Sequence, residues 1–279
     1  EAHVRFDLEY SRLYRPDAFG NLGFGFEAWA LTRKIFAFGA FTWQEPVVTY
    51  DFYEPRTNDF SRFYRYPTNR NFGGFFSTDY RKKLALDVSG NYRIFDEEGR
   101  RRFNLSVAPR LRVNDRLSFF FAINSYNWTN DVGYVTTLGN GDIIFGVRDN
   151  ITLENVFNTT YIFSNKMSFS FRLRHYWAKA EYSRFGLLDE EGRLAPTAFN
   201  DFSDDSFNAF TVDAVYRWRF APGSDIYIVW KNNTSKFSYL QDDVQYSYGK
   251  GLERLGDFPQ SNSLSLKVLY YLDYLKLVK

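Results

Sequence analysis

The chain has 279 residues, which is enough for one large all-β domain or two ordinary domains. It has no cysteine, which excludes disulfides and thiolate metal sites, and its formal net charge of +2 gives no indication of a nucleic-acid partner. Aromatic residues make up 21% of the chain, yet the mean hydropathy is −0.43 and no run reaches the roughly 18 apolar residues of a membrane helix. This combination is typical of a membrane β-barrel, in which every second strand residue faces a wet lumen.

Segments with apolar residues at every second position follow one another from the N-terminus, which predicts strands. The predicted strands cover residues 2–14, 20–31, 35–52, 71–80, 84–95, 102–113, 117–128, 150–163, 167–177, 207–220, 226–237 and 263–274. Pro46 interrupts the third segment and predicts a bulge or the rim of the sheet, because proline lacks a ladder donor. Most segments are about twice the 5–6 residues usual in a soluble β-sandwich, the alternative all-β fold.

The connections between these segments alternate in length. Short turns are expected near Arg33, Lys82, Asp115, Asn165 and Pro222, and long loops at residues 53–70, 129–148, 183–205 and 241–259. Residues 96–100 are expected to form a tight hairpin, with Gly99 where a positive φ is needed. Barrels place short turns in the periplasm and long loops outside, so both ends of the chain are expected on the periplasmic side.

The predicted fold is therefore an all-β, transmembrane, antiparallel up-and-down β-barrel with about twelve visible strands, or up to fourteen if strands precede Glu1. Residues 1–279 are interpreted as a single domain. Because an outer-membrane protein must be exported and no signal peptide is present, we expect the natural precursor to begin earlier, with room for a further domain upstream.

The face predicted to point inward is charged. Its proposed lumen-lining residues are Arg102, Arg110, Arg112, Arg172, Arg174, Asp213, Arg217, Arg219 and Lys231, with Arg5, Asp7, Glu9, Glu27, Asp87, Arg93 and Asp273 on the same face. The arginines suit recognition of carboxylates, phosphates or sugar hydroxyls. Alternatively, they pair with the inward acids and fill a narrow lumen, and this is the interpretation we favour because twelve strands lie between filled and open barrels.

Candidate catalytic or metal chemistry is sparse. His175 shares a strand face with Leu173 and Trp177, whereas Ser168 and Ser170 point to the opposite face, which argues against a Ser–His dyad. Loop carboxylates at 189–191, 201, 204–205 and 242–243 lack EF-hand spacing, so we expect solvated loop charge rather than a Ca²⁺ site. We predict no catalytic residue, no metal ligand and no cofactor.

Several stretches resemble a known family. They are RNFGGFFSTDYRKK (70–83), YVTT (134–137), GVRDNITL (146–153), NTTYIFSNKMS (158–168), APGS (221–224) and the strand 261–274. With these stretches the chain resembles the C-terminal barrel of a Bacteroidota outer-membrane family whose members carry an N-terminal carbohydrate-binding family-9-like domain. The resemblance implies an outer-membrane location and a link to glycans, and it transfers no catalytic residue.

The functional prediction is a non-enzymatic barrel of the bacterial cell outer membrane. It is either a narrow or plugged pore or the membrane anchor of a glycan-binding extracytoplasmic domain. The alternative is an accessory subunit of a larger outer-membrane transport, secretion or assembly complex. The expected partners are outer-membrane lipid, other outer-membrane proteins, and glycan through a domain outside this sequence, but not nucleic acid.

Overall fold

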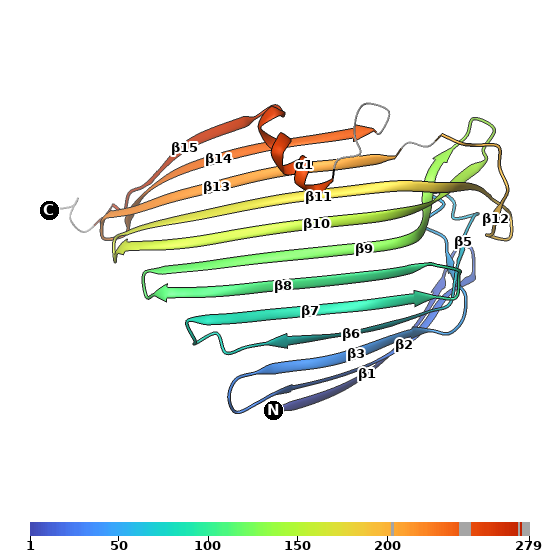
Figure 1. Cartoon of the computed structure of the whole chain (residues 1–279), viewed down its shortest axis with the longest axis horizontal. Coiled ribbons are helices and arrows are strands. Elements are labelled where there is room, and N and C mark those ends of the chain that lie inside the picture. The colour runs from blue at the N-terminus through green and yellow to red at the C-terminus, as the bar shows by residue number, and fades with distance from the viewer. Residues whose placement is uncertain (202–203, 240–246, 273, 275–279) are drawn as a thin grey trace.

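The structure is a computed structural model that describes residues 1–201, 204–239, 247–272 and 274. Its described residues form one large antiparallel sheet of 13 strands, twelve of which follow one another in chain order (Figure 1). These twelve are β1 (Ala2–Leu13), β2 (Ala18–Leu31), β3 (Ala37–Glu45), β6 (Asn69–Ser77), β7 (Leu84–Phe95), β8 (Arg101–Asn114), β9 (Leu117–Thr137), β10 (Ile143–Ser164), β11 (Met167–Leu188), β13 (Asp205–Ala221), β14 (Ser224–Tyr239) and β15 (Ser261–Leu269). The predicted all-β, up-and-down order of about twelve strands is confirmed.

The remaining elements are short. β12 (Leu194–Ala195) pairs with the end of β11, and β4 (Thr49–Asp51) and β5 (Tyr64–Tyr66) form a separate two-stranded sheet. The helix α1 (Tyr248–Glu253) continues into a 3₁₀ turn, Arg254–Asp257. Among the described helices, none has the length and hydropathy needed to cross a bilayer.

The strand register separates two faces of the sheet. One continuous row of paired residues contains Arg110 on β8, Arg172 on β11 and Lys231 on β14. The same register places all nine residues proposed from the sequence, and also Arg5, Asp7, Glu9, Glu27, Asp87 and Arg93, on this one side, which we call the polar face. Asp273 lies outside the described residues. The opposite side, the apolar face, carries Phe103, Leu105 and Leu111 of β8, all exposed.

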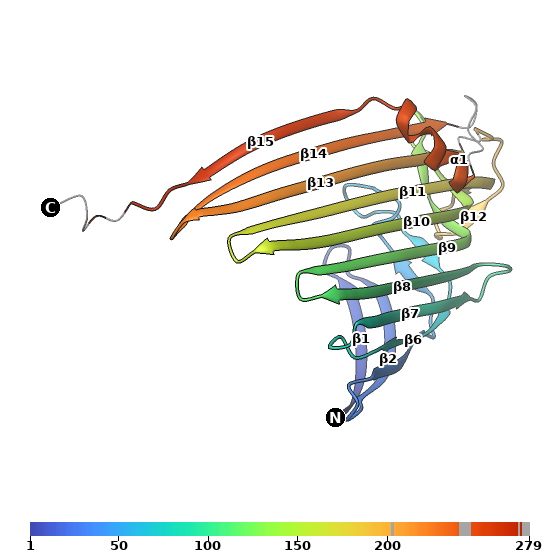
Figure 2. The ribbon, with the colours of Figure 1, turned by 60° about the vertical axis from the view of Figure 1, so that its left-hand side comes forward.

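The sheet is curved, so that β1 and β2 pass behind β6–β8 when the molecule is turned (Figure 2). Residues 46–68, which we call the inner loop, connect β3 to β6 and lie against the polar face. Tyr64 of this loop belongs to a buried cluster with Val132, Phe145, Val147 and Leu188 from β9, β10 and β11. The inner loop therefore crosses from one part of the curved sheet to another and forms a core on its inner side.

Several boundaries differ from the sequence prediction. Residues 129–148 are not a long loop, because β9 and β10 continue and meet at a tight turn where Gly141 has a φ of +89°. The ladder continues there because bulges beside Arg148 absorb the irregular residues, including Asn130 with a φ of +50°. The predicted loop at 183–205 is shorter, since β11 extends to Leu188, and β15 ends at Leu269 rather than at residue 274.

Two local predictions are confirmed. β3 ends at Glu45, directly before Pro46, so the expected rim of the sheet lies at this residue without a ladder donor. The predicted strand 35–52 is wrong beyond that point, because residues 49–51 form β4 in the separate two-stranded sheet. The hairpin between β7 and β8 turns at Gly99, whose φ of +69° is a conformation that favours glycine.

The described sheet has two open edges. β1 pairs only with β2, and β15 pairs only with β14, within the described part of the chain. The two edge strands run in opposite directions and lie far apart (Figure 2). The predicted antiparallel order is therefore present, whereas a pairing that closes the sheet on itself is not found among the described residues.

Candidate functional site

Most of the predicted lumen cations have an acidic partner on the polar face. Arg110 lies 3.3 Å from Asp87 (Nε to Oδ2), and Arg174 lies 3.2 Å from Glu154 (Nε to Oε1). These pairs support the prediction that inward arginines and acids neutralise one another. The pair with Asp87 involves an acid named from the sequence, whereas Glu154 was not singled out there.

A second group of pairs lies beside the short turn between β13 and β14. We call this end of the sheet, where the β8–β9 and β10–β11 turns also lie, the turn end. Asp225 accepts two hydrogen bonds from Arg217, each of 3.1 Å, and lies 3.4 Å from the Nε atom of Arg219. Lys231 lies 3.6 Å from the carboxylate of Asp213. Two arginines therefore share one acid that the sequence interpretation had assigned to a turn.

Arg102 lies at the opposite end of the polar face, beside the β7–β8 and β9–β10 connections. We call this end the hairpin end. Its Nη2 donates to Asp131 at 2.6 Å, and its guanidinium lies 4.3 Å from the Trp128 ring. The nine predicted residues therefore share one face but do not form one site.

The buried centre of the hairpin end is Arg100, which the sequence interpretation had assigned to a tight turn. Its side chain is fully buried, and its Nη1 donates to the Tyr64 hydroxyl at 3.0 Å and to Glu97 at 2.9 Å. Its guanidinium lies 4.8 Å from the ring of Tyr66 and 4.7 Å from that of Phe95. Burial raises the pKa of Tyr64 to about 12, so this hydroxyl stays protonated at neutral pH. The network fastens the inner loop to the sheet.

Further contacts hold the inner loop across the sheet. Glu54 accepts from the backbone N–H of Tyr134 at 2.8 Å, and the N–H of Arg65 donates to the carbonyl of Gly192, also at 2.8 Å. Arg62 also donates to the carbonyl of Leu188. The loop is thus bonded to β9 and to the end of β11, and it occupies space on the inner side of the curve. None of these long-range contacts has a signal in the local sequence.

Two of the predicted lumen-lining arginines differ from the others because they have no acidic partner within the described residues. Arg112 donates only to the carbonyl of Tyr80, at 3.5 Å. Arg172 makes no hydrogen bond or ion pair within the described residues. Asp213 is opposite Arg172 in the register, but its carboxylate pairs with Lys231.

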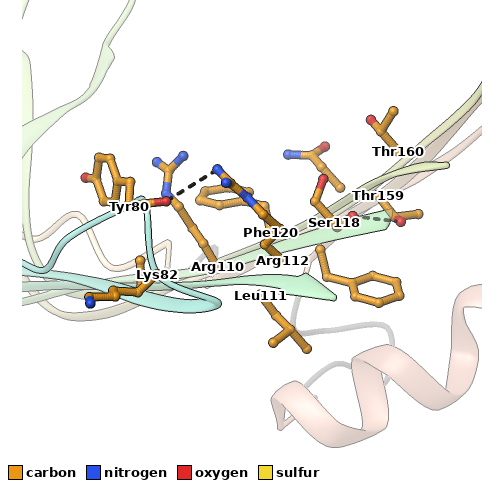
Figure 3. A pocket seen from close by; sticks show the side chains of 12 residues that line it. Tyr80, Lys82, Arg110, Leu111, Arg112, Ser118, Phe120, Thr159 and Thr160 are labelled. Atoms are coloured by element: carbon orange, nitrogen blue, oxygen red, sulfur yellow. Dashed lines mark hydrogen bonds between the residues drawn. The ribbon is translucent and has the colours of Figure 1, made fainter. Parts of the chain in front are cut away.

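Arg112 lines a pocket of about 300 Å³ at the turn end of β8, β9 and β10 (Figure 3). Figure 3 shows Arg110, Arg112, Ser118 and Thr160 on one side of the strands, while Leu111 points to the other side. The polar-face residues around the pocket are Tyr80, Arg110, Arg112, Ser118, Phe120, Asn158 and Thr160.

The wall of this pocket is fixed by Arg110. Its guanidinium lies 4.7 Å from the Tyr80 ring and 4.8 Å from the Phe120 ring. Asp87 holds it through the ion pair and also accepts from Ser77 at 2.6 Å and from the Tyr80 hydroxyl. Arg110 is therefore committed to internal contacts. Arg112 is the polar-face arginine that remains available to the pocket, and Lys82 of the turn before β7 also lines it.

His175 lies on the apolar face with Leu173 and Trp177, as the alternation predicts. It is buried beneath α1, where its Nε2 bonds to the side-chain oxygen of Asn208 at 2.9 Å and Asn208 donates to the carbonyl of Gly251 at 2.8 Å. Ser170 pairs in register with Val215 on the polar face, so no serine of this strand approaches the imidazole.

The loop carboxylates are dispersed in the described residues. Asp189 accepts from the backbone N–H of Arg193 at 2.7 Å, and Asp204 accepts from the N–H of Tyr182 at 2.6 Å. No three His, Asp or Glu side chains in the described ranges are grouped so that they could hold a metal ion. Asp242 and Asp243 lie outside those ranges.

Known proteins similar to this chain were found at the level of family and of fold. No curated protein matches the sequence. Among solved structures, the copper transporter OprC is similar with a TM-score of 0.52 and 11% identity, over 96% of this chain and 41% of that chain. The chain thus corresponds to less than half the length of that transporter, and at this identity the likeness shows the barrel-type fold alone. The model of the family described as Domain of unknown function (DUF5916) matches residues 1–279, and the chain therefore belongs to that family.

Proposed function

We propose that this chain is a non-enzymatic barrel wall of the bacterial outer membrane, with its polar face toward the lumen and its apolar face toward lipid. The observation that carries this proposal is the separation of the two faces. Large apolar side chains remain exposed across the apolar face, from Val4 at 70% on β1 to Leu264 at 75% on β15. Such an extended exposed apolar surface is unfavourable in water and is what a bilayer requires.

The inner loop and the ion pairs support a narrow or plugged lumen rather than a wide pore. The loop lies on the inner side of the curved sheet, and Arg110, Arg174 and Arg217 are each neutralised by an acid. A filled lumen would also suit a membrane anchor for a glycan-binding extracytoplasmic domain, as the family resemblance implies. Copper is not the cargo we propose, because the chain has no cysteine, one methionine and two histidines, whereas copper sites favour thiolate, thioether and imidazole ligands.

A second candidate function is favoured by the open edges. A strand edge in hydrocarbon leaves backbone groups without partners, so the edges β1 and β15 need further strands beside them. An accessory subunit of a larger outer-membrane complex would receive such strands from another protein. Purification in mild detergent, followed by identification of bound proteins, distinguishes this function from a self-contained pore or anchor.

Cysteine labelling in whole cells tests the proposed location and topology. Because the chain has no native cysteine, each substitution gives a unique label. We expect a membrane-impermeant maleimide to label Glu190→Cys, in the connection after β11, but not Asn165→Cys, in the short turn between β10 and β11. Lysed cells should give equal labelling of both variants, which controls for reactivity. Labelling of the Asn165 variant alone in intact cells would contradict the orientation.

A further inference from the structure

We propose that the pocket at the turn end of β8, β9 and β10 binds a small organic oxyanion, with two arginine ligands: Arg112, which lines the pocket, and Arg172, which lies one strand beyond its lining residue Asn158. This inference rests on the proposed function, because it requires the polar face to line a water-filled space. It goes further by naming the site and the chemical class of the ligand, a phosphate- or carboxylate-bearing molecule small enough for a pocket of about 300 Å³.

The first argument is charge. Arg110 and Arg174, the neighbouring arginines on the same two strands, each have an acid within 3.3 Å. Arg112 and Arg172 have none among the described residues, although the face supplies acids to their neighbours. Guanidinium groups form strong, directional hydrogen bonds with carboxylates and phosphates. A bound oxyanion would therefore satisfy donors that the fold itself leaves open.

The second argument is geometry. The register places Ser118 and Thr160 in one row with Arg112, and Asn158 beside Arg172 in the adjacent row. β8 and β11 are three strands apart, which is about 14 Å between their backbones. Arg112 lines the pocket and makes only one long hydrogen bond, of 3.5 Å, to the Tyr80 carbonyl, while Arg172 is paired in register with the lining residue Asn158. An anion that engages both must draw their side chains over β9 and β10. One small anion can then lie over β9 and β10 between them.

The third argument is the floor of this gap. The side chains of Ser118, Asn158 and Thr160 line the pocket and make no hydrogen bond within the described part of the chain. Figure 3 shows Ser118 and Thr160 on the arginine side, and the register places Asn158 on the same face. Hydroxyl and amide groups can donate to anionic oxygens or to sugar hydroxyls. The rings of Tyr80 and Phe120, held against Arg110, add a flat apolar wall. The combination fits an oxyanion attached to a small ring.

Calorimetric titration of the full-length protein, purified in detergent, tests the site. The probes are glucose 6-phosphate, glucuronate, inorganic phosphate and uncharged glucose. We expect glucose 6-phosphate or glucuronate to bind and glucose not to bind, and the stronger of the two identifies the oxyanion. Arg112→Gln and Arg172→Gln should each weaken binding at least about tenfold, because each removes a charge-assisted contact.

Arg219→Gln is the matched control, since it removes the same charge from the turn end of the same face, where Arg219 is paired with Asp225. It should change the affinity less than about twofold. If Arg219→Gln weakened binding equally, the affinity would depend on the overall positive charge of the polar face, and the specific site would be overturned. Heat-modifiable migration on a gel shows that the barrel is folded. If folded wild-type protein bound none of the probes, the site would also be overturned. The proposed location is tested separately, by the labelling experiment.

Discussion

Val107→Arg is expected to destabilise the lipid-inserted sheet by about 2–4 kcal/mol, the effect of a basic side chain at the lipid-facing midplane of a barrel. Val107 lies midway along the apolar face of β8, with Leu105 before it and Leu111 after it. It pairs with Val88 on β7 and with Ile123 on β9, so an arginine there is surrounded by apolar neighbours and has no acid to pair with.

Ser106→Arg is the matched control, because it adds the same side chain at nearly the same depth on the polar face. Ser106 donates to Asn124 at 2.7 Å, and its loss should cost only about 1 kcal/mol, the usual net value of one hydrogen bond. Urea unfolding of protein refolded into lipid vesicles, followed by tryptophan fluorescence, measures both variants. Equal losses at positions 106 and 107 would mean that the two faces of β8 are not separated between lumen and lipid.

The two faces could be predicted because strand side chains alternate with a period of two, whatever the partner strands are. β7 shows how well this works when apolar positions are regular, since its observed bounds, Leu84–Phe95, equal the predicted ones. Residues 129–148 show where it does not, because their Gly, Asn and Asp content is typical of loops. Their strand conformation depends on neighbours across β9 and β10, and on Phe145 packing against Tyr64.

The candidate site could be predicted only in part, for the same physical reason. Alternation places Arg110 and Arg112 on one face, but it cannot tell that Asp87 neutralises the first and leaves the second open. That difference depends on the register between β7 and β8 and on the position of Tyr80. Likewise, residues 96–100 have the composition of a tight turn, and nothing in that composition shows that the inner loop buries Arg100.

Replacing the inner loop, residues 46–68, by Asn-Gly is expected to produce the largest change in conductance. Glu45 and Asn69 are already paired across β3 and β6, so a two-residue hairpin can join them without moving either strand. The replacement removes the contacts of Tyr64, Glu54 and Arg65 with the sheet and leaves the inner side of the curve open. The strand pairing that defines the sheet is untouched.

Planar-bilayer recording compares the loop replacement with wild type in the same lipid, after circular dichroism has shown equal strand content. Wild type should give little or no steady current, because the inner loop and the ion pairs fill the lumen. The replacement should give steady channels that favour anions, since Arg112 and Arg172 remain on the polar face without acidic partners and rings of arginine select anions. Arg112→Gln in the same background should reduce the preference for anions, because it removes one unpaired charge from the conducting wall. Cation-selective channels, or an unchanged current after the loop is removed, would mean that the polar face and its inner loop do not line the path of the ions.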